Sequence, residues 1–132
     1  MSHPEISDEE VFRFILHQMD TVPHLEALLL LWRKRPLGFT ESELSAQLFV
    51  DANTVSEIVK NLQRRELIAA TADASREYRY EAKSAYTDAL MQALSDMYSR
   101  ELISISKLIH SKTASAAQDF ARAFKFTKDR EK

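Results

Sequence analysis

The stretch from Thr40 to Ile68, TESELSAQLFVDANTVSEIVKNLQRRELI, decides how this chain folds. Its pattern predicts a short helix, a tight connection, a second helix and the start of a strand. In the second helix, apolar residues recur at positions i, i+3, i+4 and i+7, which indicates one buried face. At about 100° per residue, the opposite face is polar and charged. The buried set is Val55, Ile58, Val59 and Leu62, and the opposite set is Asn53, Glu57, Lys60 and Arg64.

A helix that is anchored on one face and offers Asn, Lys and Arg on the other suits the major groove of DNA. The segment also resembles the helix-turn-helix of winged-helix transcriptional regulators, especially the MarR-like and related bacterial groups. Their pattern reads roughly E-L-A-x-x-L, a turn, x-x-T-V-S, x-x-V, x-x-L and x-x-x-L-I. The matching residues are Glu43, Leu44, Ser45, Leu48, Thr54, Val55, Ser56, Val59, Leu62, Leu67 and Ile68.

The resemblance extends from the helix near Leu25 to the strands that end near Ala82. It implies a mainly helical winged helix-turn-helix, with a three-helix core and a small β-hairpin wing, flanked here by an N-terminal helix and a long C-terminal helix. It also implies DNA binding and transcription regulation. Because winged helices serve as protein-binding modules too, a protein–protein interaction module without direct DNA binding is the alternative.

Three positions depart from the family's pattern. Phe49 stands where a turn glycine is common, and because a bulky residue is disfavoured at positive φ, another turn geometry is expected. Glu66 stands where glycine tends to precede the final Leu-Ile pair. Glu57 stands where arginine is frequent, and it directs an anion toward a polyanion. A glutamate there could accept from a cytosine amino group or remain a solvated surface residue.

Composition narrows the class of protein. The 132 residues suffice for one domain with its own core, and the absence of cysteine excludes disulfides, thiolate zinc sites and cysteine nucleophiles. One glycine and three prolines favour a mostly helical chain. The acidic start is unlike a secretory signal, and the longest apolar run, residues 27–32, is far short of the roughly 20 residues that span a bilayer. A cytoplasmic protein without membrane contact is expected.

The net charge of −2 is unusual for a strong nucleic-acid binder. Residues 1–20 have a net charge of −4, residues 21–82 hold eight basic and nine acidic residues, and residues 83–132 have a net charge of +3. DNA affinity must therefore come from local cationic patches, because the summed field gives little steering.

Capping residues and periodicity predict the other elements. Capping boxes are expected at Ser7 with Glu10 and at Thr40 with Glu43. For the helix that follows residue 21 and for the helix that follows residue 53, two cap residues are possible in each case, and they are named at the end of this paragraph. After residue 67 the pattern predicts a hairpin over residues 67–71 and 76–81 with a turn at 73–75. A single long helix is expected from Ser84 to about His110, then an amphipathic piece over residues 116–126. The alternative caps are Asp20 or Thr21 and Asp51 or Asn53.

These elements divide the chain into an acidic N-terminal helix (1–20), a winged helix-turn-helix domain (21–82) and a C-terminal part (83–132) with a long and a short helix. Three apolar elements flanking one small DNA-reading unit predict a homodimer that reads a pseudo-palindromic site. The C-terminal part is expected to dimerise, and the N-terminal helix to join the dimer or to pack as an arm.

The DNA-binding prediction names nine residues. Five are expected to face base edges and four to hold phosphates. The base-facing residues are Asn53, Ser56, Glu57, Lys60 and Asn61; the phosphate-binding residues are Arg64, Arg65, Arg76 and Arg79. Singly, each basic residue is equally well explained as a solvated surface charge.

Other functions find little support. The four histidines lack metal-ligand spacing, and a chain with one glycine can hardly build a glycine-rich phosphate loop. We therefore expect no enzyme activity, metal or cofactor. An effector pocket between the reading unit and the long helix is possible, but no residue marks one. The run from Arg33 to Arg35 is best explained by its place at a helix C-terminus.

Overall fold

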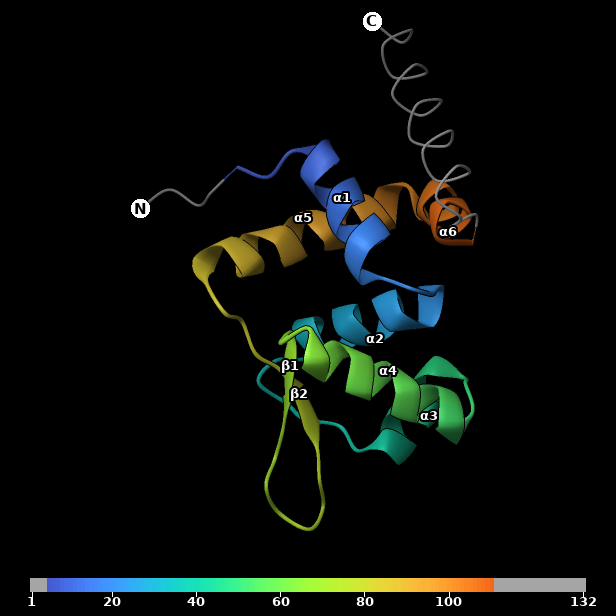
Figure 1. Ribbon diagram of the computed structural model, residues 1–132, viewed down its shortest axis with the longest axis vertical. Coiled ribbons are helices and arrows are strands. Elements are labelled where there is room, and N and C mark those ends of the chain that lie inside the picture. Colours follow the sequence, from blue (N-terminus) through green and yellow to red (C-terminus); the bar gives the residue numbers. More distant parts are fainter. Residues whose placement is uncertain (1–4, 111–132) are drawn as a thin grey trace, which may run out of the picture.

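The computed structural model describes residues 5–110. Figure 1 shows three levels: α1, α5 and α6 form one layer, α2 lies in the middle, and α3, α4 and the hairpin form the opposite layer. The predicted architecture, a three-helix core (α2 to α4) with a hairpin wing, is confirmed. The elements are α1 (Asp8–Gln18), α2 (Val22–Arg33), α3 (Glu41–Leu48), α4 (Ala52–Arg64), β1 (Ile68–Ala70), β2 (Tyr78–Tyr80), α5 (Ala85–Arg100) and α6 (Leu102–His110).

Each of the first four helices begins where the sequence places a cap. A side-chain oxygen accepts a hydrogen bond from the backbone N–H three residues ahead, which satisfies a donor that the helix leaves free. Both capping boxes form, with Glu10 and Glu43 reaching back to the cap backbone. Of the alternatives, Thr21 caps α2 and Asp51 caps α4.

The turn between α3 and α4 corrects one expectation. Phe49 adopts the left-handed conformation, with φ 57° and ψ 43°, so the prediction of another turn geometry is wrong. The turn keeps this conformation because the Phe49 and Val50 N–H groups donate to the Ser45 carbonyl and close the end of α3. The Phe49 side chain is 92% exposed, so the unusual backbone forces no clash in the core. Glu66 also has a positive φ, 60°.

The single long helix predicted from Ser84 to His110 is also wrong. It breaks at Glu101, whose φ of −126° and ψ of 38° are not helical. The break lets α6 fold back and pack on α1 and α2. Ile105 and Leu108 are thereby fully buried, whereas a straight helix would carry them past the domain. The amphipathic piece predicted over 116–126 lies outside the described residues.

The hairpin is shorter than predicted. β1 and β2 pair antiparallel with Ala69 opposite Arg79, so that Arg76 falls in the connecting loop instead of a strand. Phe39 and Tyr78 exchange backbone hydrogen bonds of 2.9 and 2.8 Å, which gives β2 a second neighbour. Gly38 precedes this pairing, where an added Cβ would lie 3.0 Å from Cβ of Glu77. The chain's one glycine thus sits where backbone approaches the hairpin closely.

One hydrophobic core runs through all three levels. The apolar sides of α1, α5 and α6 are buried in it, so this chain's own packing accounts for most of the stripes that suggested dimerisation. The dimer roles of residues 1–20 and 83–132 therefore remain predictions. Within residues 5–110, no helix is both long and apolar enough to cross a bilayer. Among these residues the exposed large apolar side chains are Leu37, Phe49, Tyr86, Leu102 and Ile103.

Candidate nucleic-acid interface

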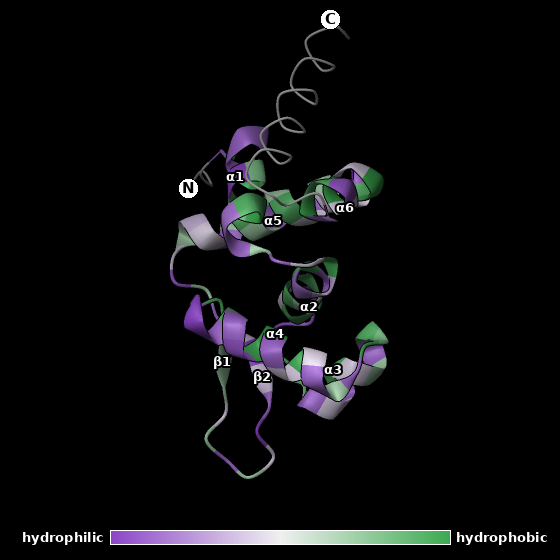
Figure 2. Ribbon diagram, turned by 45° about the vertical axis from the view of Figure 1, so that its right-hand side comes forward, coloured by the Kyte–Doolittle hydropathy of each residue, from purple (hydrophilic) through white to green (hydrophobic). Residues whose placement is uncertain are grey.

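Helix α4 offers the polar face that the sequence predicted. The four side chains of its apolar stripe, Val55, Ile58, Val59 and Leu62, are at most 1% exposed, because they pack against α2, α3 and β1. The opposite face is hydrophilic and turned away from the core, as Figure 2 shows. Its exposed side chains follow one line along the helix, at i, i+4, i+7 and i+11. They are Asn53, Glu57, Lys60 and Arg64, while Ser56 beside them is half-buried.

The N-terminus of α4 is held by a charged cap. One Asp51 carboxylate oxygen accepts from the Thr54 N–H at 2.7 Å. This backbone hydrogen bond lowers the pKa of Asp51, because it stabilises the ionised carboxylate. The first turn of α4 is therefore firmly defined, but the cap adds an anion close to the face that would meet DNA.

Two of the nine predicted residues are engaged elsewhere. The Arg65 guanidinium donates to Oδ1 of Asn61 at 2.6 Å, to the His17 carbonyl at 3.1 Å and to Oε1 of Gln18 at 3.0 Å. It also lies 3.9 Å from the carboxylate of Asp20, to which the Asn61 amide donates at 3.3 Å. Arg65 and Asn61 thus tie the last turn of α4 to the junction of α1 and α2.

The hairpin carries the last two predicted residues. Arg79 lies on the exposed face of β2, between Tyr78 and Tyr80, which point into the core. Arg76 is exposed in the loop, with φ 40°. The loop is ordered by Asp73, whose carboxylate accepts from two hydroxyls and from the Arg76 N–H. In Figure 1 the loop extends beyond α4 at the lower end of the molecule, where a wing belongs.

The charge on this side of the molecule is balanced. Lys60 and Arg64 stand beside Glu57 on α4, and Glu66 at the end of the helix is paired with Lys83. Asp51, Glu57 and Glu66 thus lie on or beside the helix that carries these cations, and their negative charge limits the affinity that phosphate contacts alone can give.

The basic run at the end of α2 does more than complement the helix dipole. The Arg35 guanidinium stacks over the Trp32 ring at 4.5 Å from its centroid and donates to the Trp32 carbonyl at 2.6 Å. Arg33 donates to the Ser95 hydroxyl at 3.2 Å and so links α2 to α5. These contacts assign Arg35 to closing the end of α2 over Trp32, and Arg33 to packing between α2 and α5.

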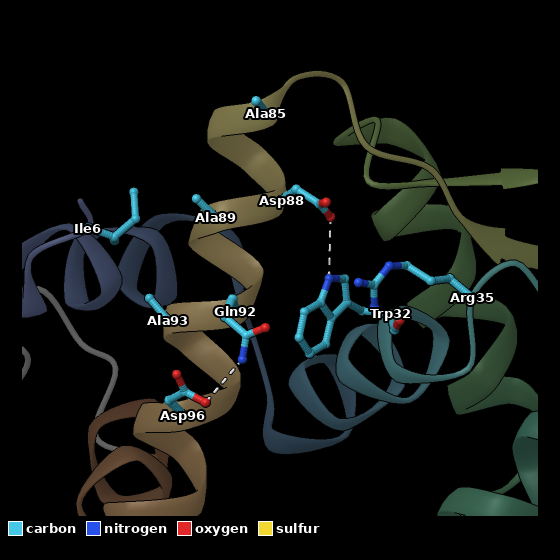
Figure 3. A pocket seen from close by; sticks show the side chains of 9 residues that line it. All are labelled: Ile6, Trp32, Arg35, Ala85, Asp88, Ala89, Gln92, Ala93 and Asp96. Atoms are coloured by element: carbon cyan, nitrogen blue, oxygen red, sulfur yellow. Dashed lines mark hydrogen bonds between the residues drawn. The ribbon is translucent and has the colours of Figure 1, made fainter. Parts of the chain in front are cut away.

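A groove of about 530 Å³ opens between the end of α2 and the first half of α5. Figure 3 shows the Trp32 indole and Arg35 on one side, with Asp88 of α5 reaching toward the indole from the other. Asp88 accepts from Nε1 of Trp32 at 3.4 Å and from the Tyr80 hydroxyl at 3.2 Å. One carboxylate on α5 thus joins α2 to the wing. The groove lies at the junction where the sequence left an effector pocket possible, although no residue marked it.

The sequence did not predict the contacts that hold α4 and the hairpin to the rest of the molecule. Asp20, Asp88 and the Phe39 pairing act over long sequence separations, and no local pattern signals them. Within residues 5–110, His, Asp and Glu form no group of three that could hold a metal ion.

Comparison with solved structures decides the fold. A MarR-family protein from Bacillus stearothermophilus superposes with a TM-score of 0.53 at 19% identity, over 94% of this chain and 84% of that one. The fold is a MarR-type winged helix. The Staphylococcus aureus MepR–DNA complex gives a TM-score of 0.54 at 18% identity, over 92% of this chain and 90% of that one.

A transcriptional regulator from Thermotoga maritima gives a TM-score of 0.53 at 17% identity, over 94% of this chain and 87% of that one. No family model matches the sequence, and no curated protein matches it. The MarR-type likeness therefore concerns the three-dimensional arrangement. The resemblance seen in the helix-turn-helix residues agrees with it.

Proposed function

We propose that this protein is a homodimeric winged-helix regulator of transcription that binds double-stranded DNA through α4 and the hairpin. The observation that carries the proposal is the division of α4 into a fully buried apolar face and an exposed polar face beside a projecting hairpin. The fold adds support, because MepR, one of the similar structures, was solved as a complex with DNA.

The proposed contacts follow from exposure. Asn53, Glu57 and Lys60, with the half-buried Ser56, read base edges, since they lie on the outer side of the first turns of α4. Arg64, together with Arg76 and Arg79 on the hairpin, holds phosphates. Asn61 and Arg65 are assigned to anchoring α4, because their polar groups are already bonded to the α1–α2 junction.

Fluorescence anisotropy with a mixed-sequence duplex tests the proposal. At low salt the full chain is expected to bind, with log affinity falling by about 0.9 per neutralised phosphate for each unit of log salt. Arg64→Ala should weaken binding and flatten that slope. Arg100→Ala is the matched control, since Arg100 is exposed at the end of α5 and away from α4. A flat titration at micromolar protein would instead support the protein-interaction module.

Glu57→Arg provides a second test. Replacing the anion in the middle of the exposed α4 face with a cation should raise non-specific affinity and steepen the salt slope. Asp96→Arg makes the same charge change at an exposed position on α5. Equal effects of the two substitutions would show that only net charge matters and that α4 does not enter the groove.

A further inference from the structure

The exposed side of α4 carries an anion, Glu57, that the fold itself does not use. Two carboxylates near it are engaged within the chain. Asp51 caps the N-terminus of α4, and Glu66, just beyond its C-terminus, pairs with Lys83. The Glu57 carboxylate takes part in none of the side-chain hydrogen bonds or ion pairs found among residues 5–110. Its charge is therefore available to a molecule that meets this side of the helix.

Glu57 stands in the middle of the side of α4 that the proposed function places in the major groove. It is exposed in the second turn; Asn53 precedes it by four residues and Lys60 follows it by three. These spacings put the three side chains on one side of the helix. Contact with DNA would remove water from the carboxylate, which is costly unless the carboxylate accepts a hydrogen bond. Phosphates and deoxyribose have no hydrogen to donate, so on the DNA side the donor has to belong to a base edge.

Of the four bases, cytosine suits a carboxylate best. In the major groove guanine presents two acceptors, and thymine presents an acceptor and a methyl group, so neither can donate. Adenine presents its amino donor next to its N7 acceptor, which repels the second oxygen of a carboxylate. Cytosine presents its N4 amino group with no acceptor of its own in the groove. The guanine paired with that cytosine offers O6 and N7 to a cation, and Lys60 is the nearest exposed cation along α4.

We infer that Glu57 selects cytosine by accepting a hydrogen bond from its N4 amino group, while Lys60 donates to O6 or N7 of the paired guanine. The inference rests on the DNA binding proposed above and names the base pair that the middle of α4 reads. Glu57 then contributes specificity instead of affinity, because its charge opposes binding at every site where cytosine is absent.

Selection from a duplex library with a randomised centre tests the preference. Duplexes that the full chain retains are sequenced, and cytosine is expected at a fixed position of the enriched motif. In fluorescence anisotropy with the enriched duplex, replacing that C·G pair with T·A should weaken binding by about tenfold or more.

Modification of the cytosine separates Glu57 from Lys60. N4-methylcytosine still pairs with guanine through its remaining N4 hydrogen, and its methyl group takes the place of the donor in the groove. The wild type should bind the modified duplex about tenfold more weakly than the unmodified one. Glu57→Ala should bind the two duplexes within about twofold of each other, whereas Lys60→Ala should weaken binding to both and keep the wild-type ratio. Asp96→Ala is the matched control, since it removes an exposed anion on α5 and should also keep that ratio.

The possible failures can be told apart. If duplexes are bound but no position favours cytosine, or if the wild type and Glu57→Ala lose the same affinity on methylation, this inference is overturned and the proposed DNA binding stands. If no duplex is bound even at low salt, the proposed function is overturned and this inference with it. Because Glu57 is exposed, Glu57→Ala should fold like the wild type, which circular dichroism verifies.

Discussion

At position 49 the backbone geometry and the residue type disagree. The turn requires a left-handed residue, and phenylalanine supplies it at a cost of about 1–2 kcal/mol relative to a residue at ease there. The exposed ring contributes no core packing to the monomer. Replacing the ring therefore changes the strain of the turn without opening a cavity in the core.

The prediction for stability compares two small replacements. Phe49→Gly should be more stable than Phe49→Ala by about 1 kcal/mol, because alanine keeps the strain that glycine relieves. Denaturant unfolding below the concentration of any dimer measures both. Equal free energies of unfolding for the alanine and glycine variants would mean that the turn relaxes out of the left-handed region when the ring is removed.

Lys60 lies on α4 and Arg65 is the C-cap of that helix, but the two side chains have different surroundings. Arg65→Ala should lower the free energy of unfolding by about 1–3 kcal/mol, because it removes several charge-assisted hydrogen bonds to the α1–α2 junction. Lys60→Ala should stay within about 0.5 kcal/mol, since Lys60 is an exposed surface residue, and should weaken DNA binding. The paired measurements are chemical unfolding and anisotropy. If instead Lys60→Ala lowered stability and Arg65→Ala weakened only DNA binding, Lys60 would be the anchoring residue and Arg65 the DNA contact.

Among the elements, α4 begins at a charged cap, the carboxylate of Asp51. The pKa of Asp51 is lowered mainly by the Thr54 N–H, so its contribution to stability is present above the ordinary carboxyl pKa and is lost as pH falls through the lowered value.

Asp51→Asn keeps a capping oxygen without the titration and should remove this part of the acid sensitivity. Asp51→Ala should lower the melting temperature at every pH. Thermal unfolding between neutral pH and about pH 3 checks both, since that range spans carboxyl titration. Unchanged acid sensitivity in the asparagine variant would assign it to other carboxylates.

The elements also show what the sequence could predict. The helix starts, the α4 stripe and the presence of the hairpin follow from side chains close together in the chain, so local patterns predicted them, although two caps were left between alternatives and the strands are shorter than predicted. The break at Glu101 was missed because it depends on α6 packing back onto α1 and α2. The engagement of Arg65 was missed for the same reason, since its partners lie more than 40 residues away. The left-handed Phe49 was missed because residue preference opposed the geometry that the turn required.

Across the whole molecule, tyrosine–carboxylate hydrogen bonds join the elements. All four tyrosines donate to a carboxylate on another element, at distances from 2.6 to 3.3 Å. The pKa of each phenol is raised, by burial first for three of them and by the carboxylate hydrogen bond first for Tyr86. The pairs are Tyr78 with Glu41, Tyr80 with Asp88, Tyr86 with Glu10, and Tyr98 with Glu26.

This pattern predicts alkaline sensitivity. Because the folded pKa values exceed that of a free tyrosine, the bonds contribute fully below about pH 10, and their contribution is lost as pH rises through the folded values. For Tyr98, burial and the nearby Glu26 carboxylate raise the pKa to about 12. The melting temperature should fall steeply above about pH 10, and less steeply in Tyr98→Phe. A flat profile in the wild type would contradict this account.

The carboxylate of Asp88 has a mechanical consequence. It holds the indole of α2 and the phenol of the wing at once, from the first turn of α5. The wing therefore cannot tilt relative to the central helix without stretching a bond to the upper layer. A displacement of the hairpin therefore reaches α5 through the Tyr80–Asp88 hydrogen bond as well as through the chain that joins β2 to α5, and this couples the orientations of the two elements.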